Sequence, residues 1–168
     1  MVWRNSDGLT VYFAGELRQF DGGEFPGAGA TRTIEFEVDA VDLTTTATAL
    51  GAPWVIIPRN SVIESVEVIS ETALAGGTSI DIGLVRLDGT TEIDYDGLVD
   101  GLPIANLNVN GEKNVLTAGV TNAGALIGTE TAYPGHLTVL ETGTFTAGRL
   151  VIRVNIYVKD VDQNPDNY

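Results

Sequence analysis

Wherever the apolar residues of this chain show a period, that period is two. In the stretch TIEFEVDAVDL, Ile34, Phe36 and Val38 alternate with acidic residues. In RLVIRVNIYVK, every second residue from Leu150 to Val158 is apolar, and the residues between them are mostly charged or polar. Successive side chains of a strand point to opposite faces. Both stretches therefore predict strands with one buried face and one face in water.

Shorter apolar runs, each ended by Gly, Pro, Asn or Thr, predict further strands. Together with weaker segments they give an expected total of about eight to ten strands. A single helical turn is predicted around Lys113 to Thr117. The shorter runs cover residues 53–58, 62–70, 79–87 and 136–141, and the weaker segments cover residues 10–20, 92–99 and 125–132.

A series of strands without intervening helices predicts an all-β fold of two packed sheets, because each sheet buries its apolar face against the other. The length of 168 residues is enough for one domain with a hydrophobic core. We therefore expect a single-domain antiparallel β-sandwich, of the jelly-roll type, over residues 31–159. An extended glycine- and aromatic-rich arm over residues 1–30 precedes it, and a polar tail over residues 160–168 follows it.

The predicted arm is rich in large apolar rings, and a glycine-rich stretch of this kind is expected to dock on something. The rings either pack on the chain's own sandwich or reach a neighbouring subunit, since aromatic residues are favoured interface anchors. The candidate interface residues are Trp3, Tyr12, Phe13, Phe20 and Phe25.

Charge and composition exclude several classes of function. Nine basic residues against 23 acidic residues give a net charge of -14, which repels nucleic-acid phosphates and anionic membrane surfaces. We expect no direct nucleic-acid or membrane partner. The absence of cysteine excludes disulfides, thiolate catalysis and cysteine-based metal sites. No signal-peptide core and no 18-residue apolar run is present, so synthesis and folding in a cytoplasm are expected.

The stretch SIDIGLVRLDGTTEIDYDGLVDG raises the question of a metal site, because it places six acidic residues among glycine and apolar residues. Glu92, Asp94 and Asp96 have the spacing of the start of a calcium-binding loop. The twelfth position of such a loop, which needs a glutamate, holds Pro103. This residue has no side-chain oxygen, so an EF-hand is excluded.

Two interpretations of the acidic stretch stay open. The favoured one is a strand, a turn at Asp88 and Gly89, and a second short strand followed by acidic turns. The other is an irregular calcium site, with Asp94 and Asp96 as its candidate ligands. On the first interpretation the protein has no metal and no cofactor.

Catalytic patterns are weak throughout the sequence. The sole histidine, His136, would have to serve any Ser-His-Asp system, yet no serine lies in a G-x-S-x-G motif. We interpret His136 as a residue near a strand end. GAGATR at 27–32 lacks the third glycine of a dinucleotide-binding loop. Acidic pairs capable of hydrolysis carry no specificity in a chain with 23 acidic residues. We therefore expect no enzyme.

The segment IPRNSVIESVEVISETALAGGTSIDIGLVRLDGTTEIDYDGLV, from Ile57 to Val99, resembles a pattern common in tailed-bacteriophage structural proteins. The resemblance rests on a strand entered from a proline, a strand of the SIDIGL kind and an acidic IDYDGLV segment. It implies a small jelly-roll or β-sandwich head protein, such as a decoration or cement protein, bound outside the major capsid protein shell. It further implies a homotrimer located on the outer surface of the virion and made in the host cytoplasm.

Two rival functions stay open at this point. One is a carbohydrate- or receptor-binding β-sandwich associated with a tail or fibre, with Trp3, Trp54 or tyrosines as its platform. The other is an enzyme or accessory domain that uses acidic pairs. Neither has a motif in its favour.

Overall fold

The computed structural model describes residues 2–4, 10–12, 31–43, 45, 48–49 and 56–158. These residues form eleven strands and two short 3-10 turns, η1 (Ala40–Asp42) and η2 (Ile104–Asn106). The strands are β1 (Val2–Arg4), β2 (Thr10–Tyr12), β3 (Thr31–Asp39), β4 (Thr48–Ala49), β5 (Ile56–Ile57), β6 (Ser61–Gly76), β7 (Ser79–Arg86), β8 (Glu92–Pro103), β9 (Glu112–Thr117), β10 (Gly135–Thr142) and β11 (Phe145–Val158).

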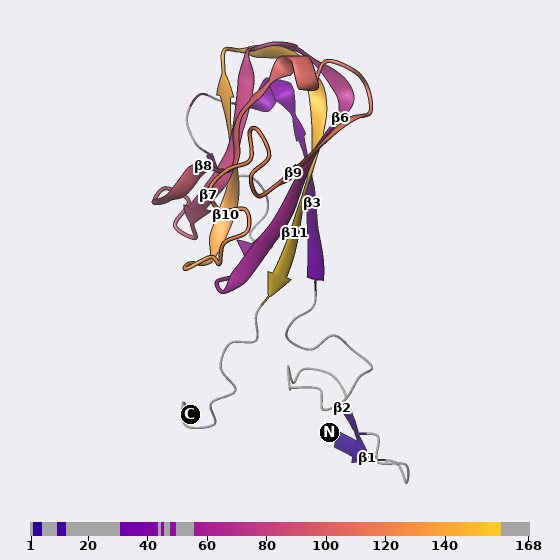
Figure 1. The fold of residues 1–168 in the computed structure, drawn as a ribbon, viewed down its shortest axis with the longest axis vertical. Coiled ribbons are helices and arrows are strands. Elements are labelled where there is room, and N and C mark those ends of the chain that lie inside the picture. Colours follow the sequence, from indigo (N-terminus) through magenta and orange to yellow (C-terminus); the bar gives the residue numbers. More distant parts are fainter. Residues whose placement is uncertain are drawn as a thin grey trace.

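Two antiparallel sheets make up the body of the protein (Figure 1). The β11 sheet has the strand order β3-β11-β6-β9, and the β10 sheet has the order β4-β10-β7-β8 with β5 beside β10. Apart from β5, the strands of the body pair first with last, second with second-last, and so on inwards. This nested pairing is that of a jelly roll, so the predicted sandwich is confirmed.

The long strands β6 and β11 form the centre of the β11 sheet. Leu150, Ile152, Val154 and Ile156 of β11 are fully buried, as the period-two pattern predicts. On β3 the inward residues Ile34, Phe36 and Val38 are only partly buried, because β3 is an edge strand.

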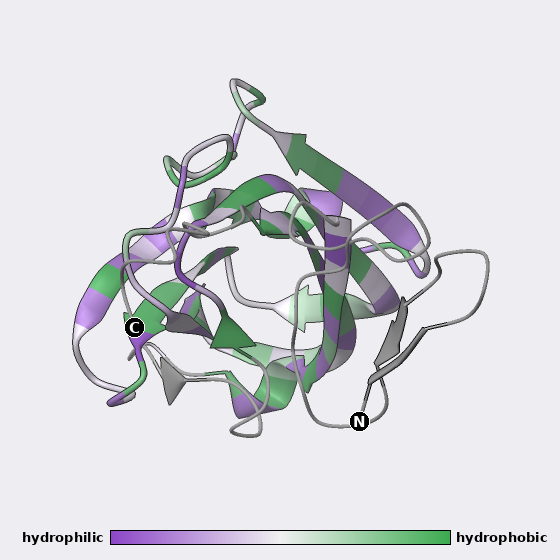
Figure 2. Ribbon diagram, turned by 90° about the horizontal axis from the view of Figure 1, so that it is seen from below, coloured by the Kyte–Doolittle hydropathy of each residue, from purple (hydrophilic) through white to green (hydrophobic). Residues whose placement is uncertain are grey.

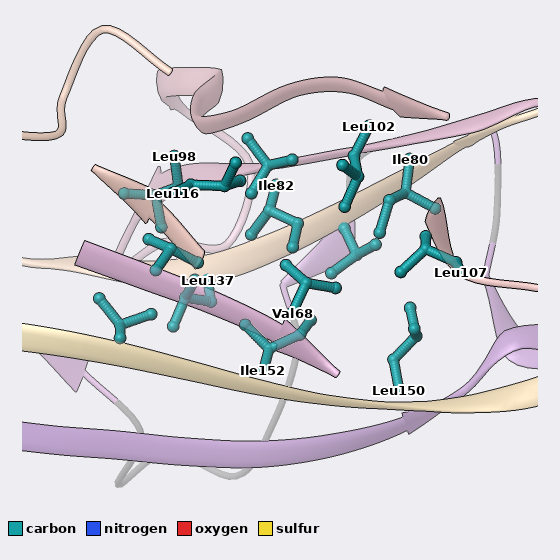
Figure 3. Close-up of a cluster of buried hydrophobic side chains, with 14 of the residues drawn as sticks. Val68, Ile80, Ile82, Leu98, Leu102, Leu107, Leu116, Leu137, Leu150 and Ile152 are labelled. Atoms are coloured by element: carbon teal, nitrogen blue, oxygen red, sulfur yellow. The ribbon is translucent and has the colours of Figure 1, made fainter. Parts of the chain in front are cut away.

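The core lies between the two sheets (Figure 3). Ile80 and Ile82 of β7 and Leu137 of β10 face the β11 sheet across this layer, and all three are fully buried. Each such side chain contributes on the order of 1.5–3 kcal/mol by leaving water. Because both sheets contribute in this way, neither one is stable as an isolated layer.

Two of the connections that cross from one sheet to the other, β6–β7 and β10–β11, lie side by side. The Gly77 N–H donates to the Thr144 carbonyl at 2.8 Å, and the Thr78 N–H donates to the Thr142 carbonyl at 2.7 Å. Gly76 has a φ of 75°, and a Cβ there would lie 2.6 Å from the Thr144 oxygen. The two connections therefore brace each other, and glycine is needed at their contact.

Two predictions of secondary structure were wrong. Lys113 to Thr117, predicted as a helical turn, belongs to strand β9, because β6 supplies a partner strand along Ser65 to Ser70. Residues 125–132, predicted as a weak strand, form a loop with only isolated bridges to β6, such as Ile63 with Ile127.

The predicted domain boundaries stay predictions. Of the arm over residues 1–30, the structure describes only β1 and β2, which pair with each other. The predicted tail, 160–168, lies outside the described residues. No helix within the described part of the chain is long and apolar enough to cross a membrane.

Candidate functional site

The acidic stretch forms an antiparallel hairpin of β7 and β8, joined by a turn over residues 87–91. In this turn the Asp88 carboxylate accepts hydrogen bonds from the backbone N–H groups of Thr90 at 2.9 Å and Thr91 at 2.7 Å. Hydrogen bonds from Thr91, and then from Thr90, lower the pKa of Asp88 to about 2. Asp88 is thus a turn-forming residue, as the favoured interpretation predicts.

Asp94 and Asp96, the candidate calcium ligands, both lie on β8. Burial raises the pKa of Asp94, and a hydrogen bond with Asp96 and the charges of Asp96 and Glu92 raise it further. Asp94 is half-buried and Asp96 is exposed. The strand therefore holds like charges close together, which costs stability while they are ionised.

On the neighbouring strand, Asp81 belongs to the same group of acids. Burial raises its pKa, and the charges of Asp100 and Asp96 act in the same direction. A hydrogen bond from the Gly101 N–H, at 2.6 Å, acts in the opposite direction and holds the Asp81 carboxylate in place. Five acidic side chains of the β7–β8 hairpin thus lie near one another, and no basic residue is among the causes that shift the pKa of Asp81 or Asp94.

Calcium binding by Asp94 and Asp96 stays a prediction. Among the residues that the structure describes, no three carboxylate or imidazole groups converge to form a site for a metal ion. Calcium takes six to eight oxygen ligands, so two carboxylates alone make an incomplete shell.

The position of the acidic strand is fixed by two close backbone contacts. A Cβ on Gly83 of β7 would lie 2.0 Å from the Asp94 carbonyl oxygen. A Cβ on Gly124 would lie 2.1 Å from the Gly97 carbonyl carbon, and the Leu126 N–H donates to the Gly97 oxygen at 2.7 Å. The sequence indicates the first of these contacts only through Gly83, because a glycine inside an apolar strand pattern is typical of a close backbone approach.

The outer face of the β11 sheet also carries many acids, but there they are paired with cations. Arg153 on β11 pairs with Glu35 on β3 and lies 3.8 Å from Glu67 on β6. Lys113 on β9 pairs with Glu67 from the other side at 2.8 Å. One row across the sheet thus alternates in sign.

A second row on this face is built around Arg149. Its guanidinium pairs with Glu37 on β3 and with Glu71 on β6, the latter at 3.2 Å. All of these groups are largely open to water, so the pairs are weak individually. Asp39 on β3 lies 3.9 Å from the same guanidinium. The two rows thus make a solvated face on which five acids each lie beside one of three cations.

At one end of the sandwich β3 begins, β6 begins, β7 ends, β10 begins and β11 ends. The register shows this directly, since Thr31 lies opposite Tyr157, Ser61 opposite Val158, and Gly135 opposite Arg86. We call this the terminal end and define it by residues 31–32, 58–61, 86–91, 130–135 and 157–158. Figure 2 views the sandwich from this end.

The terminal end presents an aromatic and basic cluster. The Arg86 guanidinium carbon lies 3.8 Å from the centre of the Tyr133 ring, which is stacking distance for a cation–π contact. Tyr133 is 47% exposed, and Leu87, which follows Arg86 in the sequence, is 48% exposed. Sequence reasoning missed this cluster, because Arg86 and Tyr133 are brought together only by the pairing of β7 with β10.

His136 is the second residue of β10, near a strand end as predicted, between Val85 of β7 and Ile56 of β5. Its Nδ1 atom is buried and has no hydrogen-bond partner among the described residues. The structure does not describe the side chains of the predicted interface residues. Trp3 lies on β1 and Tyr12 on β2, but their side chains, together with Phe13, Phe20, Phe25 and Trp54, lie outside the described residues.

Comparison with known proteins finds relatives only at the level of structure. No family model matches the sequence, and no curated protein matches it. A chain in the capsid asymmetric unit of cyanophage Pam1 matches with a TM-score of 0.53 and 11% identity, over 84% of this chain and 94% of that one.

Two further capsids contain similar chains. One is in the acid-stable capsid of the Helicobacter pylori bacteriophage KHP30, with a TM-score of 0.51, 13% identity, and 80% of this chain and 93% of that chain covered. The other is in the capsid of Ralstonia phage GP4, with a TM-score of 0.52, 15% identity, and 89% and 96% covered. At such identities the likeness is one of fold, and the fold of this protein is therefore one that occurs in phage capsids.

Proposed function

We propose that this chain is a structural protein of a bacteriophage virion, a decoration or cement protein that binds the outside of the major capsid protein shell and stabilises it. The observation that carries the proposal is the match to chains in three phage capsids. Nearly the whole of each matched chain is covered. The likeness is thus to complete chains of similar length, and a single domain of a much longer shell protein would not give this coverage.

The charge distribution supports an external position. A net charge of -14 disfavours contact with packaged nucleic acid and favours solubility at high copy number. The exposed, ion-paired outer face of the β11 sheet suits a surface that stays in water. Binding without turnover is sufficient for this role, and the weak catalytic patterns of the sequence agree with it.

Stabilisation by such a protein would come from repeated contact. An ordinary stable interface buries about 1,600 Å² in total, and many copies on one symmetric shell add their effects. We infer a homotrimer as the bound form, since a trimer fits a three-fold position of a shell. Light scattering would test this, with a native mass of about three times the 17.7 kDa of one chain expected.

The test of the function is binding to heads made without this protein. Purified chain is mixed with such heads, unbound chain is removed by sedimentation, and the bound copies are counted. We expect saturable binding and a higher temperature of head opening. Failure to bind, or binding to isolated glycans instead, would overturn the proposal in favour of a free-standing binding module.

A further inference from the structure

The basic residues of the described body fall into two groups of three. Arg149, Arg153 and Lys113 form ion pairs on the outer face of the β11 sheet. The other three lie at the terminal end, and no carboxylate of a described residue forms an ion pair with them. They are Arg32, Arg59 and Arg86.

The fold brings these three arginines together from distant parts of the sequence. Arg32 lies near the start of β3, opposite Ile156. Arg59 lies in the turn between β5 and β6, and Arg86 is the last residue of β7. Arg32 and Arg59 are exposed, and Arg86 is half-buried. In a chain with 23 acidic residues, three cations at one place without an ion-pair partner among the described residues are an unbalanced charge that a partner can satisfy.

Acidic residues at this end are already engaged or lie to one side. The Asp88 carboxylate accepts hydrogen bonds within its own turn. Glu130 has a partner of its own. Glu92 lies at the start of β8, beside Asp94 in the acidic hairpin. Among the described residues, neither Asp88 nor Glu92 forms an ion pair with the arginines.

Arg86 is held in a fixed position before any partner arrives. Its guanidinium stacks on Tyr133, and its Nε atom is buried without a hydrogen-bond partner in the described part of the chain. A stacked arginine loses little freedom on binding a carboxylate, and its planar fork suits that group. The exposed ring of Tyr133 and the exposed side chain of Leu87 add apolar contact area next to this charge.

The residues before Thr31 and the residues after Val158 both connect to the body at this end. β3 begins at Thr31 and β11 ends at Val158, and these two adjacent strands have those residues at the same end of the body (Figure 1). The chain therefore enters and leaves the sandwich at the terminal end.

From these observations we propose that the terminal end is the surface by which this protein docks on the capsid shell. Arg32, Arg59 and Arg86 bind carboxylates of the shell protein, and Tyr133 and Leu87 pack against its apolar groups. This inference rests on the proposed function and deepens it. The outer face of the β11 sheet then points away from the shell or towards neighbouring copies.

The test uses two matched double variants of the full chain. Arg59→Gln with Arg86→Gln removes two positive charges from the terminal end. Lys113→Gln with Arg153→Gln removes two positive charges from the outer face of the β11 sheet. Both double variants change the net charge equally. No substituted residue is a buried apolar one, so we expect both variants to fold. Their thermal midpoints check this. Dissociation constants are measured on heads made without this protein.

We expect the terminal-end variant to bind at least about tenfold more weakly than wild type, because charge-assisted hydrogen bonds are lost. The β11-sheet variant should change by less than about threefold. Wild-type binding should weaken when salt is raised from about 50 to about 300 mM, and the terminal-end variant should respond less.

The outcomes separate this inference from the proposed function. If wild type fails to bind the heads, both are wrong. If wild type binds and the two variants weaken binding equally, or only the β11-sheet variant does, the docking surface is wrong and the function stands. If the terminal-end variant binds heads normally but changes the native mass, the surface joins copies of this chain and the shell assignment is overturned.

Discussion

The outer face of the β11 sheet and the β7–β8 hairpin are both antiparallel and rich in acids, but they treat charge in opposite ways. On the β11 sheet, Glu35 and Glu67 flank Arg153, so acids and cations alternate across the strands. In the hairpin, Asp94 lies against Asp96, and no cation is among the neighbours that shift its pKa. The same strand pairing thus gives the acids cationic neighbours in one place and acidic neighbours in the other.

The difference shows that charge balance is decided by cross-strand neighbours. A strand such as β3 has three acids on its outer face, yet β11 supplies arginines opposite two of them. The basic residue nearest the acidic hairpin in sequence, Arg86, stacks on Tyr133 at the terminal end. Arg86 and the two other arginines at the terminal end thus leave the acidic hairpin without a cation, although they lie where the chain enters and leaves the sandwich.

The largest expected effect concerns the core on which both regions rest. Ile152 is fully buried on β11, and we expect Ile152→Ala to lower the free energy of unfolding by about 2–5 kcal/mol, since it leaves a cavity. Urea unfolding measures this loss. A cost below about 1 kcal/mol would show that the two sheets are not packed as described.

Gly83 tests the close backbone contact that fixes the acidic strand. Gly83→Ala places a Cβ 2.0 Å from the Asp94 oxygen, so we expect a loss of about 1–3 kcal/mol or a shifted strand. Gly97→Ala, where a Cβ would meet the Leu126 side chain at 2.6 Å, is a milder comparison, because that side chain can move. Equal effects in urea unfolding would argue against the backbone contact at Gly83.

We expect a single ion pair on the outer face of the β11 sheet to contribute little to stability. Lys113 and Glu67 lie 2.8 Å apart with exposed fractions of 44% and 18%. We expect Lys113→Gln to cost about 0.2–1 kcal/mol, and less at high salt. Thermal unfolding at two salt concentrations would check this. A larger cost that persists in salt would mean that the pair is shielded from water.

The smallest expected effect is a difference between Asp94 and Asp88 of the hairpin in how each changes stability with pH. The pKa of Asp94 is raised above 3.8, so the folded state keeps its proton to higher pH than the unfolded state does. Ionised Asp94 therefore destabilises the fold at pH 7, and stability is regained as pH falls through the folded-state pKa. Asp94→Asn should stabilise slightly at pH 7, by less than about 1 kcal/mol after screening by water.

Asp88 should behave in the opposite way. Its pKa is lowered to about 2, so it contributes stability above the ordinary value of 3.8 and loses it as pH falls towards 2. Thermal midpoints of Asp88→Ala and Asp94→Asn between pH 7 and pH 2 would show this contrast. If both variants changed stability in the same direction at pH 7, the account of the hairpin would be wrong.

Much of the fold follows from the sequence, since a strand's own pattern fixes which face is buried. The alternation in β3 and β11, the turn at Asp88 and the sandwich as a whole were predicted correctly. The order of strands could not be predicted, because period-two patterns give faces and not neighbours. For the same reason β9 was mistaken for a helical turn, since only its pairing with β6 makes it a strand.

The candidate surfaces were less accessible to sequence reasoning. Acids that look alike in sequence, such as Glu37 and Asp94, differ because one faces Arg149 and the other faces Asp96. The terminal end unites Arg32, Arg59 and Arg86, which are widely separated along the chain, so no local pattern could reveal it. The predicted aromatic interface over residues 1–30 stays a prediction.

The central claim is that this jelly roll binds the outside of a phage capsid shell through its terminal end. An electron cryomicroscopy reconstruction of heads with and without the bound chain tests it most directly. We predict added density outside the shell, with the start of β3 and the end of β11 facing the shell protein. Absence of added density, or density that contacts the shell through the outer face of the β11 sheet, would contradict the claim.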